Sequence, residues 1–334
     1  MTVMMGMVAP DPDGPIVALD NPPTFSAVVP VYEGAHMVAE AVASVLDQTV
    51  PACEVIIADD GSTDDLAGAL MPFSDRVTVL HQAHKGLAAA RNLALFHAKG
   101  EFIAHCDADD AFLPRYLEAM GKLVMARPDL DIFSRTCYLE RDGKPDGLTR
   151  TPENLNFPED QRLGILHGSF LGGSAVFRRQ RLIDLGGYDE SLLCAEDYDA
   201  WARMIFAGSR AALLLDPLAI RREHEGSLST RTDLCAQGVI TTLTKLMQRN
   251  DLSPAERALA RKRIRESRGE LARYIARSAV LEGRPDARWR SLRVLFGEGQ
   301  HPRNRAKAAL ASLSPRWAQW HRRERSKSML TTKP

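Results

Sequence analysis

Three carboxylates fall within the segment Asp107-Ala108-Asp109-Asp110, directly after a short apolar run. In an extended segment, residues two apart project to the same face, so Asp107 and Asp109 would point together. Adjacent carboxylates repel each other unless a cation lies between them. Hard oxygen ligands suit Mg²⁺ or Mn²⁺, which usually also bind substrate phosphates. The spacing predicts a divalent metal site, and the alternative is a solvated turn or a helix cap at Asp110.

A second acidic turn, Asp59-Asp60-Gly61-Ser62, follows another apolar run. Gly61 permits a sharp change of chain direction. A carboxylate here could accept a hydrogen bond from a base N–H or a ribose hydroxyl, as the acid after the second strand does in dinucleotide-binding folds. The alternative is that Ser62 or Asp64 only caps the following helix.

The pair Glu196-Asp197 begins a segment in which apolar residues recur at helical spacing, through Trp201 and Met204. Acids are favoured in the first turn of a helix by the helix dipole, so a structural role is one interpretation. The other interpretation is a general base, which must lie within hydrogen-bond distance of the hydroxyl that it deprotonates.

Two further positions could contact an anionic ligand or a metal. Arg91 lies in the Ala-rich segment 86–92, where its guanidinium could stack on or hydrogen-bond a base or a phosphate. His224 lies in the polar segment 221–227 and could touch a diphosphate or a metal. The alternatives are a surface charge on a helix and a polar surface loop. By contrast, His105 is expected to be a buried, hydrogen-bonded residue rather than a ligand.

Four short apolar runs alternate with segments of helical spacing in the first 110 residues. The runs span 25–31, 54–58, 76–80 and 101–106, and the helical segments include 35–48 and 86–98. Strands that are apolar on both faces predict a parallel sheet with helices on both sides. Ligands of such sheets collect at the carboxyl ends of the strands. The polar clusters after Val31, Ala58 and Cys106 are therefore expected to meet at one edge.

The rest of the chain predicts further elements of both kinds. The expected helices span 114–125 and 195–207, the expected strands span 173–177 and 211–215, and a hairpin covers 131–139 with a turn at 141–144. We expect an α/β domain over residues 24–230, with a mostly parallel, Rossmann-like sheet flanked by helices. A flexible tail over residues 1–23 and a basic helical region over residues 231–334 are expected on either side of it.

Charge is distributed unevenly along the chain, although its 43 basic and 43 acidic side chains balance. Residues 251–334 hold 21 Lys and Arg against 8 Asp and Glu. Basic residues near an anionic membrane contribute ~1 kcal/mol each, so we expect peripheral contact with such a surface. The alternative is a solvated helical face. Nucleic acid is not an expected partner, because no recognised binding module accompanies the charge.

The sequence shows no targeting segment that we recognise. Residues 1–20 lack a basic stretch followed by a sustained apolar run, so a signal peptide is not expected. No stretch reaches the roughly 18 apolar residues that a membrane span needs. The expected location is the cytoplasm, with the basic region placing the protein at the inner face of the membrane.

Taken together, these motifs resemble the family 2 glycosyltransferases, which have the GT-A fold. The resemblance covers residues 25–229 and depends on the order and spacing of several segments. The matching segments are 26–33, 44–49, 54–64, 86–92, 99–103, 107–110, 186–189 and 196–201. Each segment is common alone, whereas the whole series in this order is specific. The resemblance implies a GT-A sheet with a helical C-terminal extension.

The resemblance also implies roles for the matching residues. The residues implied to bind the donor are Pro30, Tyr32, Glu33, Asp59, Asp60, Arg91, Asp107 and Ala108. Asp107-Ala108-Asp109 is similar to the family's D-x-D motif, which binds the ribose and the metal-bridged diphosphate. Glu33 stands where the family usually has Asn, which leaves the choice of donor open.

Catalytic and metal-binding roles follow from the same resemblance. Asp197 resembles the catalytic base, with Glu196 beside it. His224, with Ser227 and Ser229, resembles a late segment that can close over the diphosphate. The implied metal ligands are Asp109, Asp107 and His224, and the implied cofactor is Mn²⁺ or Mg²⁺.

The function implied is that of an inverting glycosyltransferase. It would transfer a sugar from a nucleotide-diphosphate donor, a UDP-sugar being expected, to a hydroxyl of a glycan, lipid-linked or other acceptor in cell-surface polysaccharide synthesis. One alternative is a nucleotidyltransferase that makes the activated sugar, but such enzymes usually carry a Gly-rich loop where this chain has Pro30-Val31-Tyr32-Glu33. Another is a non-catalytic nucleotide-sugar-binding module, which would be expected to lack an acid that this chain retains.

Overall fold

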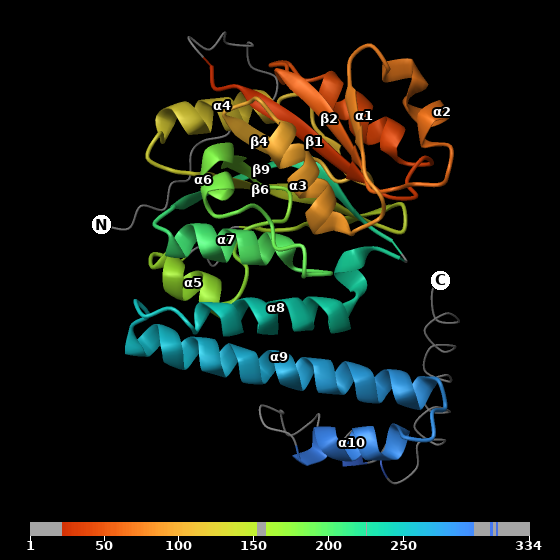
Figure 1. Ribbon diagram of the computed structural model, residues 1–334, viewed down its shortest axis with the longest axis vertical. Helices are drawn as coiled ribbons and strands as arrows, with labels where there is room; N and C mark the ends of the chain where they lie inside the picture. Colours follow the sequence, from red (N-terminus) through yellow and green to blue (C-terminus); the bar gives the residue numbers. More distant parts are fainter. Residues whose placement is uncertain (1–21, 152–157, 225, 297–307, 310–311, 313–334) are drawn as a thin grey trace. The chain divides into compact units, whose positions relative to one another are not determined.

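The computed structural model describes residues 22–151, 158–224, 226–296, 308–309 and 312 (Figure 1). The flexible tail expected over residues 1–23 lies almost entirely outside these residues. The chain divides after Ser227 into two compact units, whereas the sequence prediction places the boundary at residue 230.

Four parallel strands form the first half of the sheet, in the spatial order β3-β2-β1-β4. They are β1 (Phe25–Val31), β2 (Glu54–Asp59), β3 (Thr78–His81) and β4 (Phe102–His105). All of β1 is buried, because both of its faces are covered. Phe25, Ala27, Val29 and Val31 face a core shared with helices α1 (Val38–Leu46) and α4 (Tyr116–Ala126). The alternate residues face the other side, on which we place α3 (Leu87–His97), a helix that contacts β1 and β2.

The second half of the sheet is mixed. It contains β5 (Ala111–Phe112), β6 (Ile132–Arg141), β7 (Lys144–Leu148), β8 (Val176–Arg178) and β9 (Ala211–Glu223). β8 pairs antiparallel to both β4 and β6, β9 runs parallel to β6, and β5 pairs antiparallel to β9. The α/β fold is confirmed, and the parallel pairing that the sequence predicts is concentrated in the first four strands.

Strand β9 is longer than the sequence indicates, and this extension matters for the site. The apolar run ends at Leu215, and Asp216 and Pro217 look like the end of a strand. Pairing with β6 nevertheless continues to Glu223 beyond an irregularity in register. Pairing with β6 therefore keeps the polar residues up to Glu223, just before His224, in the strand. The periodicity of apolar residues does not predict a strand there.

Helices cover the sheet in the first unit (Figure 1). The longer ones are α1 (Val38–Leu46), α3 (Leu87–His97), α4 (Tyr116–Ala126) and α7 (Glu196–Phe206). The shorter helices are α2 (Leu66–Leu70), which the sequence predicts after the turn at 59–64, and α5 (Gln161–His167) and α6 (Arg179–Asp184), which it does not predict. The expected cap of α2 was also wrong: Asp65, rather than Ser62 or Asp64, accepts a hydrogen bond of 3.0 Å from the Gly68 N–H.

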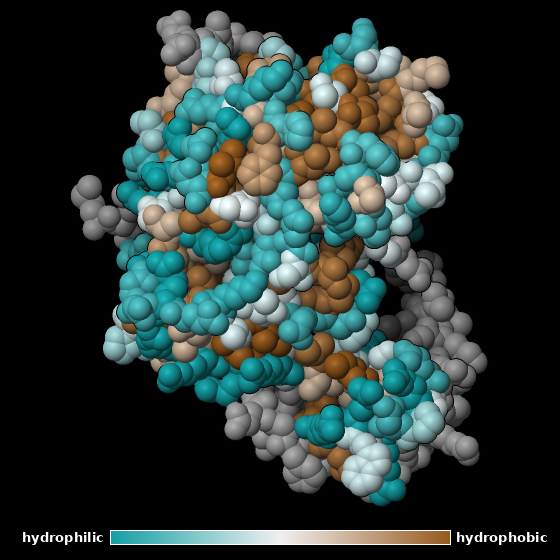
Figure 2. All heavy atoms as spheres, in the orientation of Figure 1, coloured by the Kyte–Doolittle hydropathy of each residue, from teal (hydrophilic) through white to brown (hydrophobic). Residues whose placement is uncertain are grey.

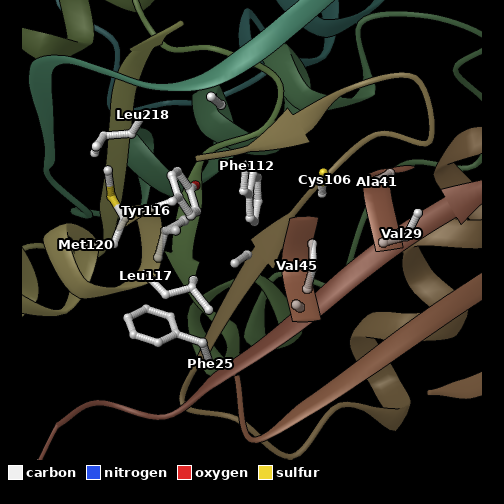
Figure 3. Close-up of a cluster of buried hydrophobic side chains, with 14 of the residues drawn as sticks. Phe25, Val29, Ala41, Val45, Cys106, Phe112, Tyr116, Leu117, Met120 and Leu218 are labelled. Atoms are coloured by element: carbon white, nitrogen blue, oxygen red, sulfur yellow. The ribbon is translucent and has the colours of Figure 1, made fainter. Parts of the chain in front are cut away.

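The main core lies between the sheet and helices α1 and α4. Figure 3 shows Phe25 and Val29 of β1 with Val45 of α1 and Tyr116 and Leu117 of α4. Each of these side chains is at most 1% exposed. Full burial of a side chain of this size contributes about 1.5–3 kcal/mol. This core fixes the strands whose carboxyl ends carry the acidic turns.

The second unit is helical, as expected. It contains the 3-10 helix η2 (Leu228–Thr230) and the helices α8 (Thr232–Leu246), α9 (Pro254–Leu281) and α10 (Ala287–Phe296). Helix α9 begins with a capping box, in which Ser253 Oγ accepts from the Glu256 N–H and Glu256 Oε2 accepts from the Ser253 N–H. Among the described residues, no helix combines the length and apolar character needed to cross a membrane.

Hydrophilic residues cover much of the visible face, with hydrophobic residues scattered between them (Figure 2). Scattered apolar residues are normal on protein surfaces and need no special function. The sites of interest are therefore identified from their polar contacts rather than from surface hydropathy.

Candidate active site

The carboxyl ends of β2, β1 and β4 lie side by side, because these strands are parallel neighbours. The predicted convergence of the segments after Val31, Ala58 and Cys106 is thereby confirmed. The Asp60 N–H donates to the Val31 carbonyl at 2.9 Å, which ties the turn after β2 to the end of β1. Tyr32 follows directly, with its side chain about half exposed.

Asp60 is buried and holds the turn that leads into α3. Its Oδ1 accepts from Gln82 Nε2 at 2.7 Å and from the Lys85 N–H at 2.9 Å. Its Oδ2 accepts from the Gly86 N–H at 2.8 Å and lies 2.9 Å from His84 Nδ1. The His84 ring stacks on the Tyr32 ring, with centroids 4.0 Å apart. The carboxylate thus orders a turn whose exposed histidine meets the predicted base-binding tyrosine.

The remaining predicted residues at this edge take up supporting positions. Asp59 Oδ1 accepts from the Ser62 N–H at 2.9 Å, and its Oδ2 lies 2.8 Å from His81 Nδ1. Glu33 has a left-handed backbone, with φ of 51°, and its carboxylate accepts from Thr63 at 2.9 Å. The two apolar residues of the predicted donor site lie at the same edge of the sheet. Pro30 is buried in β1, and Ala108 packs against the main core.

Arg91 is buried and joins two of the predicted acidic motifs. Its Nη2 donates to Asp107 Oδ1 at 2.7 Å, and its Nη1 donates to Glu196 Oε1 at 2.6 Å. The side chain is only 2% exposed, so the alternative of a free surface charge is wrong. Through this one guanidinium, the acidic turn after β4 and the start of α7 lie at the same place.

Helix α7 begins with the candidate base. Ala195, just before it, has a left-handed backbone with φ of 64°, which is uncommon for a residue with a Cβ and is often found at functional sites. Asp197 is partly exposed, and its Oδ1 accepts from the Tyr198 N–H at 2.7 Å. Its Oδ2 faces Gly173, where an added Cβ would lie 2.9 Å away. A carboxylate held in this way can accept a proton from a hydroxyl that approaches it.

The charges around Arg91 influence one another. Burial raises the pKa of Glu196 to about 7, against the opposing effect of the Arg91 guanidinium. Desolvation would also raise the pKa of Asp107, but the charge and hydrogen bond of Arg91 lower it. Burial lowers the pKa of His105 to about 3, and Arg91 adds to the effect. His105 is fully buried with Nε2 3.0 Å from the Tyr188 hydroxyl, so its expected structural role is confirmed.

The acidic segment after β4 is not extended, and in this respect the sequence interpretation was wrong. The Asp110 N–H donates to the Asp107 carbonyl at 2.9 Å, which closes a turn. Asp107 therefore faces Arg91 and Ser174, whereas Asp109 Oδ2 lies 3.2 Å from His224 Nε2. Burial, followed by the charge of Asp107, raises the pKa of Asp109.

The donor atoms at this turn suit a hard divalent cation that also binds phosphate. Asp109 and His224 supply a carboxylate oxygen and an imidazole nitrogen, with side chains 26% and 39% exposed. Within the part of the chain that the structure describes, no group of three or more His, Cys, Asp or Glu side chains is placed to hold a metal. Mg²⁺ usually binds through one or two carboxylates together with substrate phosphates. The residues present fit such a shared site rather than a closed protein site.

Sequence reasoning missed the segment that joins these groups. Ser174 Oγ donates to Asp107 Oδ2 at 3.3 Å, and Trp201 Nε1 donates to the Gly172 carbonyl at 3.2 Å. The buried Arg135 donates to the Ser174 carbonyl at 2.5 Å. The sequence predicts a strand from residue 173, but β8 begins at Val176. The two adjacent glycines were the available signal, since glycine in a strand pattern often marks close backbone approach.

The family model described as Glycosyl transferase family 2 matches residues 26–186. This range contains the acidic turns after β2 and β4 and ends before α7. Residues 26–186 are therefore similar to glycosyltransferase family 2, and the fold is that of the GT-A glycosyltransferases.

Several curated relatives are named as glycosyltransferases. An uncharacterized glycosyltransferase of Rickettsia prowazekii is 25% identical over 69% of this chain and 70% of its own length. The glycosyltransferase GlyG of Streptococcus pneumoniae is 39% identical over 36% of this chain and 41% of its own length. The putative teichuronic acid biosynthesis glycosyltransferase TuaG of Bacillus subtilis is 33% identical over 41% and 56%. The chain thus spans about half the length of the last two relatives.

Two solved structures show the same fold. Staphylococcus aureus TarS 1–349 in complex with UDP-GlcNAc superposes with a TM-score of 0.59 and 18% identity, over 90% of this chain and 92% of that one. The mannosyltransferase PcManGT of Pyrobaculum calidifontis, in complex with GDP-Man and Mn²⁺, gives a TM-score of 0.58 and 21% identity, over 93% and 90%.

Proposed function

We propose that this protein is a glycosyltransferase and that it inverts the configuration of the sugar that it transfers from a nucleotide-diphosphate donor to an acceptor hydroxyl. The observation that carries the proposal is the position of Arg91, which binds Asp107 at 2.7 Å and Glu196 at 2.6 Å. It brings the D-x-D turn and the candidate base, Asp197, to one site. An inverting reaction needs this arrangement, because the acceptor must approach the sugar opposite its leaving group.

The reaction proposed is a single displacement. The acceptor oxygen forms a bond to the anomeric carbon while the bond from that carbon to the diphosphate oxygen breaks. Asp197 takes the proton of the acceptor hydroxyl, and the diphosphate leaves with the bonding electron pair. Gly173 leaves room beside Asp197 Oδ2, because a side chain there would meet the carboxylate.

The donor is proposed to lie along the edge formed by β2, β1 and β4. Tyr32 would stack on the base, and Asp59, Asp60 and Glu33 would shape the turns around it. Asp109 and His224 would hold Mn²⁺ or Mg²⁺ together with the donor diphosphate, with Asp107 supporting them from the same turn, as Mn²⁺ in the PcManGT complex suggests. A bound divalent cation would neutralise charge on the leaving diphosphate. UDP-sugars and GDP-sugars are the first donors to test, since related folds bind UDP-GlcNAc and GDP-Man.

The substitution Asp197→Asn tests the base assignment. The amide keeps the shape of the side chain but cannot accept the proton, so kcat should fall about 10²–10⁴-fold while the Kd of the donor changes little. The measurement is release of nucleoside diphosphate, with donor binding followed separately. Asp184→Asn is a suitable control, since the hydrogen bond that Asp184 accepts from Gln180 is exposed. Near-normal kcat in Asp197→Asn would show that another group is the base.

A donor screen separates this proposal from its alternatives. UDP-, GDP- and TDP-sugars are incubated with Mn²⁺ or Mg²⁺, with and without EDTA, and release of the nucleoside diphosphate is measured. A nucleotidyltransferase would instead require a sugar phosphate and a nucleoside triphosphate, and a binding module would release nothing. Transfer that continues unchanged in excess EDTA would refute the metal role.

The proposed setting is cell-surface polysaccharide synthesis at the cytoplasmic side of an anionic membrane. TuaG, whose name refers to teichuronic acid, supports the pathway class. In α10, Trp289 is 70% exposed between Arg288 and Arg290, a combination that suits the headgroup region of a bilayer. Sedimentation with phosphatidylglycerol vesicles at low salt should recover the protein, and Trp289→Ser should weaken recovery. Equal recovery with phosphatidylcholine vesicles would argue against charge-based contact.

A further inference from the structure

Arg222, near the end of β9, ties the acidic turn after β4 to this strand. Its Nη1 donates to the Asp109 carbonyl at 3.2 Å. Its own backbone N–H donates to Asp110 Oδ1 at 3.0 Å. Arg222 therefore holds two consecutive residues of the turn, Asp109 through its guanidinium and Asp110 through its main-chain N–H.

The other nitrogens of the guanidinium are anchored on two further elements. Nη2 donates to Glu40 Oε1 of α1 at 2.6 Å, and Nε lies 3.4 Å from Glu140 Oε2 of β6. The side chain of Arg222 is 23% exposed. Glu40 and Glu140 offset the positive charge of Arg222 and fix the direction of its planar guanidinium. The single flexible ammonium group of a lysine would not hold the same fixed direction toward three separate acceptors.

The position of the turn decides what the Asp109 side chain faces. Asp109 Oδ2 lies 3.2 Å from His224 Nε2, and His224 is two residues beyond Arg222 in the chain. The His224 N–H is itself fixed by Ser227 Oγ at 3.0 Å. Because Arg222 holds the Asp109 main chain against the strand that delivers His224, it sets the distance between the two candidate metal ligands.

We propose that Arg222 is a positioning residue for the metal-binding pair Asp109 and His224. The inference rests on the proposed function, since it concerns how that site is preformed. Arg222 itself need not touch the cation or the nucleotide. Its side chain acts by holding the Asp109 carbonyl, and its loss should leave the Asp109 carboxylate free to move away from His224.

The test measures metal affinity directly. Mn²⁺ is titrated into the full chain, alone and with UDP or GDP, and free Mn²⁺ is followed by electron paramagnetic resonance. The variants are Arg222→Met, which keeps the apolar stem, and Arg222→Lys, which keeps the charge. Arg221→Met is the matched control: Arg221 is the neighbouring residue, points to the other face of the strand, and pairs with Glu223 at 3.4 Å.

We expect Arg222→Met to bind Mn²⁺ about tenfold more weakly than the wild type, as is typical when the partner of a metal ligand is removed. Arg222→Lys should recover part of the loss, and Arg221→Met should bind as the wild type does. The thermal midpoints of the two methionine variants should be similar, which a purely structural role would not produce. If Arg222→Met is not folded, Glu40→Gln replaces it, with a smaller loss of Mn²⁺ affinity expected.

Two results with the variants would overturn the inference. One is wild-type Mn²⁺ affinity in Arg222→Met, or in Glu40→Gln where that variant is the one measured. The other is an equal loss of affinity in Arg221→Met. A wild-type chain that transfers sugar but binds no Mn²⁺ would refute the metal role and this inference together, leaving the transferase proposal intact.

Discussion

Gly173 is placed where a side chain would meet the proposed base, so Gly173→Ala is a direct test of the site. An ideal Cβ there would lie 2.9 Å from Asp197 Oδ2, whereas ordinary contacts begin at 3.4 Å. The carboxylate would have to move by about 0.5 Å. Its other oxygen is held by the Tyr198 N–H at 2.7 Å, which opposes free rotation.

The expected magnitude follows from this displacement. A misplacement of about 1 Å can cost about 10²-fold in rate, so half of that should lower kcat about tenfold. The KM for the donor should change little, because Asp197 is proposed to contact the acceptor. The thermal midpoint should also change little, since the atom that must move is the end of a side chain.

The assay is steady-state release of nucleoside diphosphate with a fixed acceptor. Gly172→Ala is the control, because a Cβ at Gly172 would lie 3.7 Å from Ser134 Oγ, an ordinary contact. If Gly173→Ala kept kcat within twofold of the wild type, the proposed role of the Asp197 geometry would be refuted. A fall in kcat in both glycine variants would point instead to a general effect on the segment.

Three further predictions concern buried charge. Burial raises the pKa of Glu196 to about 7, so below that pH its side chain becomes neutral and its ion pair with Arg91 is lost. The kcat of the wild type should therefore fall as the pH drops through 7. Glu196→Gln should show the low kcat at every pH, without this inflection. Asp60→Asn places an NH₂ group among the four nitrogens that surround the Asp60 carboxylate. The free energy of unfolding, measured by denaturant titration, should therefore fall by about 1–3 kcal/mol. An unchanged free energy of unfolding would show that the turn tolerates the amide. Hydrogen bonds from Arg115 and Lys122 lower the pKa of Glu118 to about 2, so the Glu118 carboxylate stabilises the fold at any pH above its unfolded pKa. This contribution to the free energy of unfolding, on the order of 3 kcal/mol, should disappear as the pH falls toward 2. It should be absent at every pH in Glu118→Gln.

The parts of the fold that could be predicted are those in which local pattern and burial agree. Strand β1 is apolar except for Ser26 and lies inside the sheet, so its secondary structure and its burial could be predicted from the local sequence. The end of β9 is polar and is held by pairing with β6, which no local pattern reveals. Segment 172–174 was missed for the same reason, because its position depends on distant partners such as Trp201 and Arg135.

The chemistry of the site was predicted more completely than its geometry. The acids at the strand ends were named from their types and spacing, and the structure places them at one edge. The extended geometry assumed for Asp107 and Asp109 was wrong, because the Asp110 N–H closes a turn. The burial of Arg91 could not be predicted either, since an arginine on an Ala-rich helix is usually exposed. Its two acids lie 16 and 105 residues away in the chain.

Arg91 also determines which substitutions can test catalysis. Its guanidinium is 2% exposed, and removing one partner of a buried ion pair typically costs about 3–5 kcal/mol. Loss of activity in an Arg91 variant would therefore not distinguish a folding defect from a defect in donor binding. Gly173→Ala and Arg222→Met leave this pair intact, because they change the position of groups in the site rather than its buried charge.

Because Arg91 joins Asp107 to Glu196, a donor that brings negative charge to the D-x-D turn should also shift the pKa of Glu196 beside the base. Measuring the pH profile of kcat against that of donor binding would reveal this coupling, and identical profiles in Glu196→Gln and wild type would exclude it.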